Sequence, residues 1–288
     1  MPELPEVEIL VRHLGPVLWD RVVQEVTVHR PKVVRPQSEA ALRAALRGCR
    51  FTGVRRRAKY LVFELTDASR SGRAPASVTL VGHLGMTGRM YVQSRQLPLP
   101  KHTAVSLDLG TDVLVYEDTR YFGRLNLDVA ALAKLGPEPL EDGFTPGQLQ
   151  AALKTSRQAI KVKLLDQTLI AGVGNIYASE ALYRAGINPR CSARRLKPVA
   201  VEKLWRSIRE VLGEAIANGT TIPLTLADGG RTDGLFYYSQ DSGNSRFYEE
   251  RLLVYDRAGA PCRRCQTPIQ RFVQAARSTF WCPHCQRD

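Results

Sequence analysis

Apolar residues at the start of the chain recur at helical spacing. The residues that form this stripe are Leu4, Val7, Val11 and Leu14. Positions three or four apart lie on one face of a helix, and the Gly15-Pro16 pair is a typical stop signal. Glu6 and Glu8 lie near the beginning, where the helix dipole favours acidic side chains. The pattern therefore predicts a helix over about residues 5–15.

Short runs rich in β-branched and aromatic residues follow, as is typical of strands. They cover residues 22–28, 60–65, 78–81 and 113–116. A polar segment with Gly and Pro, residues 67–76, separates two of these runs and is interpreted as a loop. Together the runs predict a β-rich domain from residue 2 to about residue 134.

The pattern changes after residues 135–140, whose sequence Leu-Gly-Pro-Glu-Pro-Leu is typical of a rigid linker. Helices are predicted from Thr145-Pro146 onward, with proline in the first turn, and over residues 158–169, 176–185 and 198–217. A Gly-Val-Gly-Asn turn at residues 172–175 interrupts them. A tight turn of this kind can present backbone N–H groups to phosphate. We expect a helical domain at 135–225, a Gly/Ser/Asp-rich region at 226–254 and a separate segment at 255–288.

That last segment contains two Cys-x-x-Cys pairs. The four thiols are Cys262, Cys265, Cys282 and Cys285. Their spacing matches a structural zinc site with four thiolate ligands, which leaves no open position for a catalytic water. Two disulfides, or four separate buried thiols, are the alternative. We expect one structural Zn²⁺ and interpret Cys49 and Cys191, which belong to no such motif, as ordinary thiols.

The charge balance points to a polyanionic partner. Lys and Arg number 41 against 28 Asp and Glu, which gives a net charge of +13, and nucleic acid is the first candidate for such a chain. Residues 41–59 carry seven basic and no acidic residues, and the cysteine segment is also rich in Arg. We expect the two to form a shared phosphate-binding surface, with a merely solvated face as the alternative.

No apolar run is long enough to span a membrane, and no apolar leader is evident. These features predict a cytoplasmic, nucleoid-associated protein of bacterial type with no membrane partner. A clamp built from two lobes can act alone, so we expect a monomer.

The first eight residues, Met-Pro-Glu-Leu-Pro-Glu-Val-Glu, carry candidate catalytic chemistry. Removal of Met1 would leave Pro2 as a secondary amine directly followed by Glu3. A secondary amine that attacks a carbonyl-level carbon forms a cationic iminium, which is an electron sink, and an adjacent carboxyl can move the protons. The alternative is that Pro2 and Pro5 simply begin a helix.

Several motifs, in order along almost the whole chain, resemble those of the formamidopyrimidine-DNA glycosylases in the formamidopyrimidine/endonuclease VIII family. They are PELPEVE at 2–8, RRAKYL at 56–61, HLGMTG at 83–88, LGPEPL at 135–140, GVGNIYASE at 172–180 and the four cysteines. The resemblance implies an α+β fold. An N-terminal β-sandwich with a leading helix is followed by a helix–two-turn–helix domain and a zinc finger, with double-stranded DNA as the partner.

The resemblance also implies catalytic roles. Pro2 would attack the sugar carbon of a damaged nucleotide flipped out of the stack, and Glu3 would protonate the sugar. Lys59 would assist the first elimination, and Arg277 would grip the flanking phosphates and assist the second. The implied activity is that of a bifunctional glycosylase and AP lyase. It would excise 8-oxoguanine and formamidopyrimidines and cut the abasic strand by β,δ-elimination in base excision repair.

A further set of residues matches the family's contacts to DNA. Met86 and Phe122 would fill the space left by the flipped nucleotide, and Arg120 would hydrogen-bond the orphaned base and favour cytosine. Three residues match backbone contacts, namely His102, Lys161 and Asn175.

The chain departs from the family pattern in two places. Tyr121 replaces a basic residue, which leaves one phosphate contact open, and the segment 220–254, which caps the everted base in the family, is longer than usual. Lesion preference is therefore open, with oxidised pyrimidines as the alternative substrate. Two different functions also stay open, namely that of a non-catalytic protein that binds damaged DNA and that of an RNA-binding zinc protein.

Overall fold

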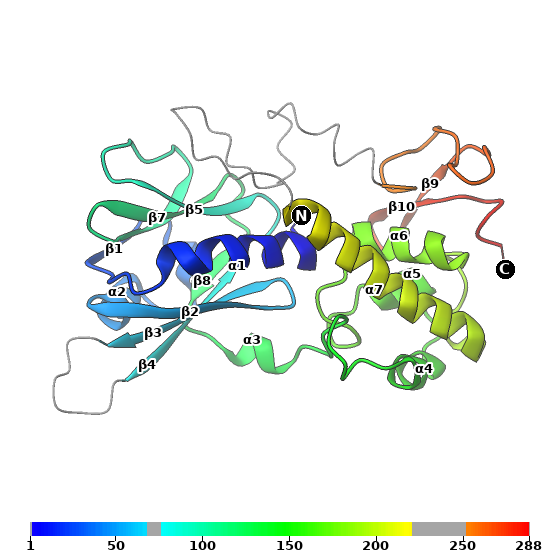
Figure 1. Cartoon of the computed structure of the whole chain (residues 1–288), viewed down its shortest axis with the longest axis horizontal. Helices are drawn as coiled ribbons and strands as arrows, with labels where there is room; N and C mark the ends of the chain where they lie inside the picture. Colours follow the sequence, from blue (N-terminus) through cyan, green and yellow to red (C-terminus); the bar gives the residue numbers. More distant parts are fainter. Residues whose placement is uncertain (1, 68–75, 221–251, 288) are drawn as a thin grey trace. The chain divides into compact units, whose positions relative to one another are not determined.

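The computed structural model describes residues 2–67, 76–220 and 252–287 (Figure 1). These residues fall into two compact units, of which the first ends at Ala133 and the second begins at Lys134. Most of the expected loop at 67–76, and nearly all of the region 226–254 expected to cap the damaged base, lie outside the described residues.

Helix α1 (Leu4–Leu18) opens the N-terminal unit and runs past its predicted end. Gly15 and Pro16 lie inside the helix, so the predicted stop is wrong by one turn. Burial explains the extension. Leu14 and Leu18 are both fully buried, and burying a leucine side chain stabilises by about 1.5–3 kcal/mol. That gain offsets the single hydrogen bond that a proline removes from a helix.

Two four-stranded antiparallel sheets build the rest of this unit. One has the order β1 (Glu25–Val28), β6 (Thr103–Asp108), β7 (Asp112–Asp118), β5 (Gly88–Ser94). The other has the order β2 (Cys49–Arg57), β3 (Tyr60–Asp67), β4 (Ser77–His83), β8 (Arg124–Asn126). Short helices η1 (Pro31–Val34) and α2 (Glu39–Leu46) lie between β1 and β2. The expected sandwich with a leading helix is confirmed.

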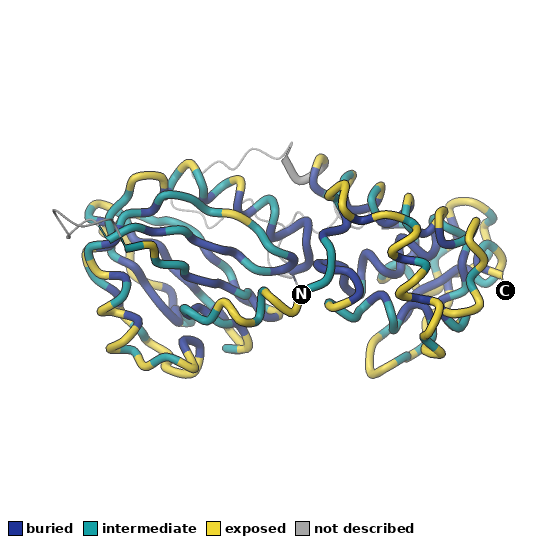
Figure 2. Tube along the Cα trace, turned by 90° about the horizontal axis from the view of Figure 1, so that it is seen from below, coloured by how far each residue is buried: buried dark blue, intermediate teal, exposed yellow. Residues whose placement is uncertain are grey.

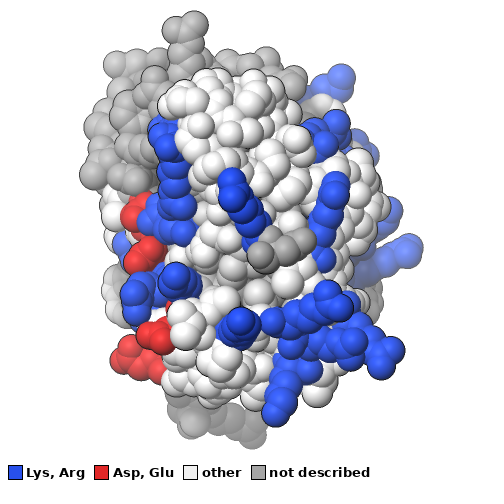
Figure 3. All heavy atoms as spheres, turned by 90° about the vertical axis from the view of Figure 1, so that its right-hand side faces the viewer, with Lys and Arg blue, Asp and Glu red and all other residues white. Residues whose placement is uncertain are grey.

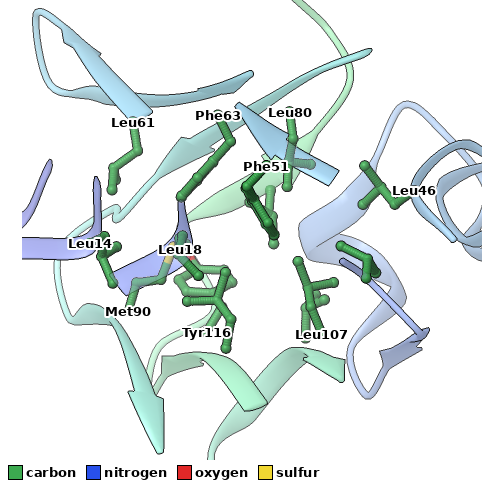
Figure 4. Close-up of a cluster of buried hydrophobic side chains, with 14 of the residues drawn as sticks. Leu14, Leu18, Leu46, Phe51, Leu61, Phe63, Leu80, Met90, Leu107 and Tyr116 are labelled. Carbon is green, nitrogen blue, oxygen red and sulfur yellow. The ribbon is translucent and has the colours of Figure 1, made fainter. Parts of the chain in front are cut away.

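The core lies between the two sheets and includes one face of α1 (Figure 4). Phe51 of β2 and Phe63 of β3 meet edge to face at 6.0 Å between ring centroids. Tyr116 of β7 and Met90 of β5 contribute from the opposite sheet. Buried residues follow the strands, whereas exposed residues concentrate in the loops (Figure 2). The loops at the sheet ends are therefore the parts that can meet a partner.

The C-terminal unit is helical and ends in a hairpin. After the short helix α3 (Ala130–Ala133) of the first unit come α4 (Pro146–Lys154), α5 (Ile160–Leu164), α6 (Asn175–Ala185), η2 (Ala193–Arg195) and α7 (Pro198–Thr220), then β9 (Gln270–Gln274) and β10 (Arg277–Trp281). Within the described ranges, no helix combines the length and apolar character needed to cross a bilayer.

The helix predicted over 158–169 is wrong in length, because α5 ends at Leu164. Two side chains redirect the backbone after it. The carboxylate of Asp166 accepts a hydrogen bond from the Thr168 N–H at 2.9 Å. Gln167 accepts from the Gly172 N–H at 2.9 Å and donates to the Val173 carbonyl at 2.8 Å. Such local bonds compete with a helix, and they shape the turn that leads into α6.

Candidate active site and nucleic-acid interface

Pro2 and Glu3 lie immediately before the first turn of α1, and both are buried. The backbone N–H of Glu3 donates to the Glu6 carboxylate at 2.8 Å, which closes the helix start. Leu4 and Val7, which follow on the same helix, are fully buried in the unit. The helix therefore holds the candidate nucleophile and its neighbouring acid in a fixed position at its positive end.

Lys59 lies in the two-residue turn between β2 and β3 and is 7% exposed. The preceding residue, Ala58, adopts a left-handed conformation with φ of 53°. The turn is tied to α1 by Arg56, whose guanidinium donates to the Glu8 carboxylate at 2.8 Å and also to the Ala58 carbonyl at 3.2 Å. One ion pair thus links the turn that carries Lys59 to the helix that carries Pro2.

His83, at the end of β4, connects Lys59 to the next loop. Its Nδ1 accepts a hydrogen bond from the Gly85 N–H at 3.1 Å, and its ring lies 4.8 Å from that of Tyr60. Burial, followed by the positive charges of Lys59 and Arg124, lowers the pKa of His83 to about 4. The imidazole is therefore neutral at physiological pH.

Met86, Arg120 and Phe122 come together, although two different loops carry them. Met86 lies between β4 and β5 and is 42% exposed, and Phe122 lies between β7 and β8 and is 51% exposed. Arg120 bridges them, since its Nη1 lies 3.3 Å from the Met86 sulfur and its guanidinium lies 4.7 Å from the Phe122 ring centroid. We call this exposed group the wedge.

A buried carboxylate organises both loops of the wedge. Asp118 is fully buried. Its oxygens accept hydrogen bonds from the Thr87 hydroxyl at 2.6 Å, the Arg120 N–H at 3.1 Å and the Gly123 N–H at 2.8 Å. Only glycine fits at 123, because a Cβ there would overlap the Tyr116 hydroxyl. The sequence analysis did not select Asp118 as a site residue, although its position two residues before Arg120 in the same motif could have indicated a role.

A fourth predicted residue in this region, His102, meets Tyr121 beside the wedge. Its Nδ1 lies 3.3 Å from the Tyr121 hydroxyl. The guanidinium of Arg30 lies over the Tyr121 ring at 4.9 Å from the centroid. Tyr121 has a φ of 52°, which is uncommon for a residue other than glycine.

In the C-terminal unit, three predicted residues converge on one strand. Arg277 is exposed at the start of β10. The next residue, Ser278, accepts through its carbonyl from Lys161 Nζ at 2.9 Å and from Asn175 Nδ2 at 3.0 Å. Lys161 also donates to the Thr279 hydroxyl at 2.8 Å and is only 1% exposed. The ammonium of Lys161 therefore lies under β10, and the DNA-backbone contact expected for this residue stays a prediction.

Buried groups also hold the segment before this hairpin in place. The Glu180 carboxylate accepts from the backbone N–H groups of Leu253, Val254 and Tyr255 at 2.8–2.9 Å. Burial raises the pKa of Glu180, and these hydrogen bonds act in the opposite direction. The carboxylate fastens the start of the cysteine segment to helix α6.

The four predicted ligands form a compact cluster, with all sulfurs within 4.8 Å of one another. Tetrahedral zinc with Zn–S bonds of about 2.3 Å requires sulfurs about 3.8 Å apart. The Cys262–Cys285 distance of 3.9 Å and the Cys265–Cys282 distance of 3.4 Å fit that requirement. The Tyr183 hydroxyl lies 3.1 Å from the Cys262 sulfur and can donate to a thiolate. The donor set therefore fits one structural Zn²⁺.

Comparison with known proteins agrees with this geometry along the whole chain. The formamidopyrimidine-DNA glycosylase N-terminal domain matches residues 1–125, the H2TH domain of the same family matches 135–225, and the zinc finger found in FPG and IleRS matches 259–287. The formamidopyrimidine-DNA glycosylase of Desulfitobacterium hafniense is 40% identical over 99% of this chain and 100% of its own length. That of Thiobacillus denitrificans is also 40% identical, over the full length of both.

The chain belongs to the formamidopyrimidine-DNA glycosylase family. Solved members of the family are similar throughout. A MutM in complex with DNA containing carbocyclic 8-oxo-G is 31% identical, with a TM-score of 0.84 and full coverage of both chains. The Lactococcus lactis enzyme bound non-covalently to DNA containing an AP site is 31% identical, with a TM-score of 0.82 over 99% of this chain and 100% of that one. The zinc finger predicted from the cysteine spacing is thus confirmed.

The basic run at 41–59 lies in α2, in β2 and in the turn that follows β2. The fold brings carboxylates to most of its arginines. The pairs are Arg43–Glu25 at 3.1 Å, Arg50–Asp20 at 2.8 Å, Arg55–Glu64 at 2.8 Å and Arg56–Glu8 at 2.8 Å. These carboxylates come from distant segments, and the shared phosphate-binding surface expected for this run stays a prediction. One end of the C-terminal unit carries many Lys and Arg side chains, whereas Asp and Glu are visible only along one edge of that view (Figure 3).

Proposed function

We propose that this chain excises oxidised purines from double-stranded DNA and then cuts the abasic strand, with the amine of Pro2 as the nucleophile. As a formamidopyrimidine-DNA glycosylase, it is a DNA glycosylase with AP lyase activity. One observation supports the detailed assignment. Pro2 and Glu3, at the start of α1, belong to the same unit as the Lys59 turn and the exposed wedge.

The proposed reaction begins once Met1 has been removed. The Pro2 lone pair forms a bond to the sugar C1′, the C1′–N bond breaks, and the damaged base leaves with that electron pair. Glu3 protonates the sugar ring oxygen, which opens the ring and gives an iminium. The helix dipole disfavours protonation of an amine at this end of α1, which keeps the Pro2 amine neutral.

Elimination then follows from the acidity of the iminium. Loss of a C2′ proton lets the 3′ phosphate leave, and a second elimination releases the 5′ phosphate. We assign the first step to Lys59, whose turn is linked to α1 by the Arg56–Glu8 pair. We assign the phosphate grip for the second to Arg277, at the exposed end of the zinc hairpin.

The wedge would occupy the stack when the damaged nucleotide is flipped. Unstacking costs a few kcal/mol, about what an inserted apolar side chain can recover. Met86 and Phe122 supply the apolar surface. Arg120, held between them by contacts to the sulfur and the ring, is placed to hydrogen-bond the orphaned base.

We propose a supporting role for two of the residues expected to contact the DNA backbone. Lys161 and Asn175 both hold the Ser278 carbonyl, directly beside Arg277. Their function would be to fix the direction in which Arg277 projects. His102, at the edge of the wedge, stays a proposed phosphate contact.

Oxidised purines are favoured over oxidised pyrimidines because the N-terminal motif is Pro-Glu-Leu-Pro-Glu. Two solved relatives support this choice, since one is bound to DNA containing carbocyclic 8-oxo-G and the other to DNA containing FAPY-dG. The chain would act as a monomer on nucleoid DNA. Its four parts would be the catalytic domain at 2–134, the helix–two-turn–helix domain at 135–225, the capping region at 226–254 and the finger at 255–288.

Borohydride trapping tests the proposal. Zinc-loaded protein whose intact mass shows loss of Met1 should form a covalent adduct with a duplex that carries 8-oxoguanine opposite cytosine. Pro2→Gly and Glu3→Gln should lose base excision, whereas Glu39→Gln, in the exposed first turn of α2, should not. A parallel duplex with dihydrouracil should react more slowly.

Two results would contradict the proposal. Failure of trimmed wild-type protein to cross-link would remove the Pro2 mechanism and leave a non-catalytic binding protein. Faster excision of dihydrouracil than of 8-oxoguanine would move the substrate class to oxidised pyrimidines.

A further inference from the structure

The cations of the N-terminal unit divide into two groups. In one group each guanidinium meets a carboxylate. Besides the four pairs of the 41–59 run, Arg12 pairs with Glu8, Arg21 with Asp112 and Arg95 with Asp108. In the other group, no ion pair is formed with any described residue. Its exposed members are Arg30, Lys32, Arg35, Lys101 and Arg120.

The second group gathers on loops that contact one another. Arg30 precedes η1, and η1 packs against β8. The Asn126 side chain of β8 donates to the Arg35 carbonyl at 2.7 Å. Lys101 adjoins His102, and His102 meets Tyr121 in the β7–β8 loop. The unpaired cations therefore lie around the wedge, whereas most arginines of the 41–59 run are paired with carboxylates.

Arg30 is the most constrained of the flanking cations. Its guanidinium lies on the Tyr121 ring, 4.9 Å from the centroid, and its backbone N–H donates to the Ala104 carbonyl at 3.1 Å. The side chain is exposed, and none of its five N–H donors meets an acceptor among the described residues. A guanidinium placed over an aromatic ring can still donate hydrogen bonds to an anion.

We propose that Arg30, positioned by Tyr121, binds a DNA phosphate next to the wedge. The inference rests on the proposed function, because the wedge must enter a duplex for Arg30 to lie beside its backbone. The residue between Arg120 and Phe122 is uncharged in this chain, and Arg30 brings the positive charge to the same place from a different loop. Half or more of protein–DNA hydrogen bonds go to the backbone, and arginine is a principal donor.

Tyr121 positions a second donor as well. When its hydroxyl donates to Nδ1 of His102, the imidazole is neutral and carries its proton on Nε2. That tautomer can donate to a phosphate oxygen while Nδ1 stays bound to tyrosine. Tyr121 would thus replace one direct contact with two positioned ones, through its ring to Arg30 and through its hydroxyl to His102.

The salt dependence of binding tests the proposal. The probe is a duplex with a tetrahydrofuran abasic analogue, which is bound but not cleaved, and the protein is full-length and zinc-loaded. Each phosphate contact contributes about 0.9 to the slope of log K against log salt. Arg30→Gln should therefore lower the magnitude of the slope by about 0.9, and weaken binding about tenfold at about 50 mM and about threefold at about 200 mM salt.

Arg47→Gln is the matched control. It removes the same charge from an exposed position at the end of α2, where Arg47 lies 3.8 Å from Glu25. Its slope should equal that of the wild type. An unchanged slope in Arg30→Gln, or equal changes in both variants, would overturn the proposal.

A double-mutant cycle tests the role of Tyr121. If the ring positions Arg30, the effect of Arg30→Gln should shrink to about twofold or less in a Tyr121→Leu background, because neighbours in contact are not additive. Equal effects in both backgrounds would overturn the positioning role.

The proposed function can fail independently of the Arg30 proposal. Wild-type protein that shows the expected slope but never cross-links to 8-oxoguanine DNA would refute the Pro2 mechanism and leave the Arg30 result intact.

Discussion

The two units hold their exposed functional side chains in different ways. In the N-terminal unit, the buried Asp118 carboxylate gathers the two wedge loops through three hydrogen bonds from their backbone and hydroxyl groups. In the C-terminal unit, four thiolates form a metal site, and the buried Lys161 ammonium holds the hairpin that carries Arg277. The N-terminal unit thus fixes its wedge loops with hydrogen bonds to one buried side chain, whereas the C-terminal unit adds a metal site to its buried polar contacts.

The difference follows from how much apolar core each region has. The wedge loops extend from a sandwich with a large continuous core, so they need only local fixing. The cysteine hairpin has a small cluster of buried residues, and small domains without a sufficient core commonly need a metal. The N-terminal loops should therefore tolerate chelators, whereas the C-terminal hairpin should not.

Zinc removal should give the largest effect and should separate the units. Binding of structural zinc contributes about 10–16 kcal/mol at neutral pH in isolated finger peptides, so chelation or Cys262→Ser should unfold the hairpin. DNA affinity should fall more than about 100-fold, since Arg277 would lose its position. Hydrogen exchange should show new exposure in β9 and β10 and none in β5 or β7. Exchange that rises equally in both units would refute this division.

Replacement of the buried anion is the converse experiment. Asp118→Ala leaves the Gly123 N–H without an acceptor and the Arg120 N–H with only the Thr87 hydroxyl at 3.3 Å, and a lost acceptor costs about 1–3 kcal/mol. We expect a loss of stability of about 3–4 kcal/mol and weaker DNA binding, with zinc content unchanged. Asp118→Asn, which keeps one carbonyl acceptor, should lose about half as much. Urea unfolding and zinc quantification check both, and zinc loss in Asp118→Ala would contradict the independence of the two units.

Local patterns predicted some of this organisation and missed the rest for identifiable reasons. The cysteine pairs and the α1 stripe were readable because their signals are periodic or closely spaced. Strand β2 was missed, since its arginines were interpreted as a basic run. Strands β5, β6 and β8 carry no strong β-branched pattern. The helix predicted over 158–169 ended early because side-chain bonds from Asp166 and Gln167 outweigh helix propensity there.

The candidate site also shows that sequence patterns select residues but do not show their tertiary contacts. Motif resemblance selected Met86, Arg120 and Phe122, and the fold brings them into contact. It also selected Lys161, but only the folded chain shows that this ammonium is buried under β10. The sequence pattern also did not show the carboxylate partners of the 41–59 run, which lie in distant segments such as α1, β1 and β3. Sequence patterns reveal which charges exist, and tertiary contacts decide which are neutralised.

Lys161→Met tests whether Lys161 supports strand β10 or contacts the DNA backbone directly. Removal of a buried ammonium leaves the Thr279 hydroxyl unpaired, which should cost about 1–3 kcal/mol. DNA affinity should fall severalfold, but the salt slope should stay unchanged, because no phosphate contact is lost. A salt slope lower by about 0.9 would show instead that Lys161 contacts a phosphate directly. Lys163→Met, on the same helix and paired with Asp166, is the matched control and should change neither the DNA affinity nor the salt slope.

The smallest predicted effect concerns pH and the N-terminal unit alone. Burial and the Lys59 charge lower the pKa of His83 from 6.5 to about 4. The unfolded chain then binds a proton that the folded chain refuses, so this group reduces stability as the pH falls from about 6.5 towards 4. The linkage predicts a loss of about 1 kcal/mol between about pH 7.5 and 5.5.

His83→Asn removes that dependence. The amide oxygen of asparagine can accept from the Gly85 N–H in place of Nδ1, and it does not titrate. The variant should be less stable than the wild type at neutral pH, because it loses the packing of the imidazole against Tyr60. The difference in unfolding free energy between the wild type and the variant should narrow by about 1 kcal/mol at about pH 5.5. Urea unfolding at both pH values measures it. Zinc release on acidification affects both proteins equally, so a gap that stays constant would show that His83 is not held neutral by burial and the charge of Lys59.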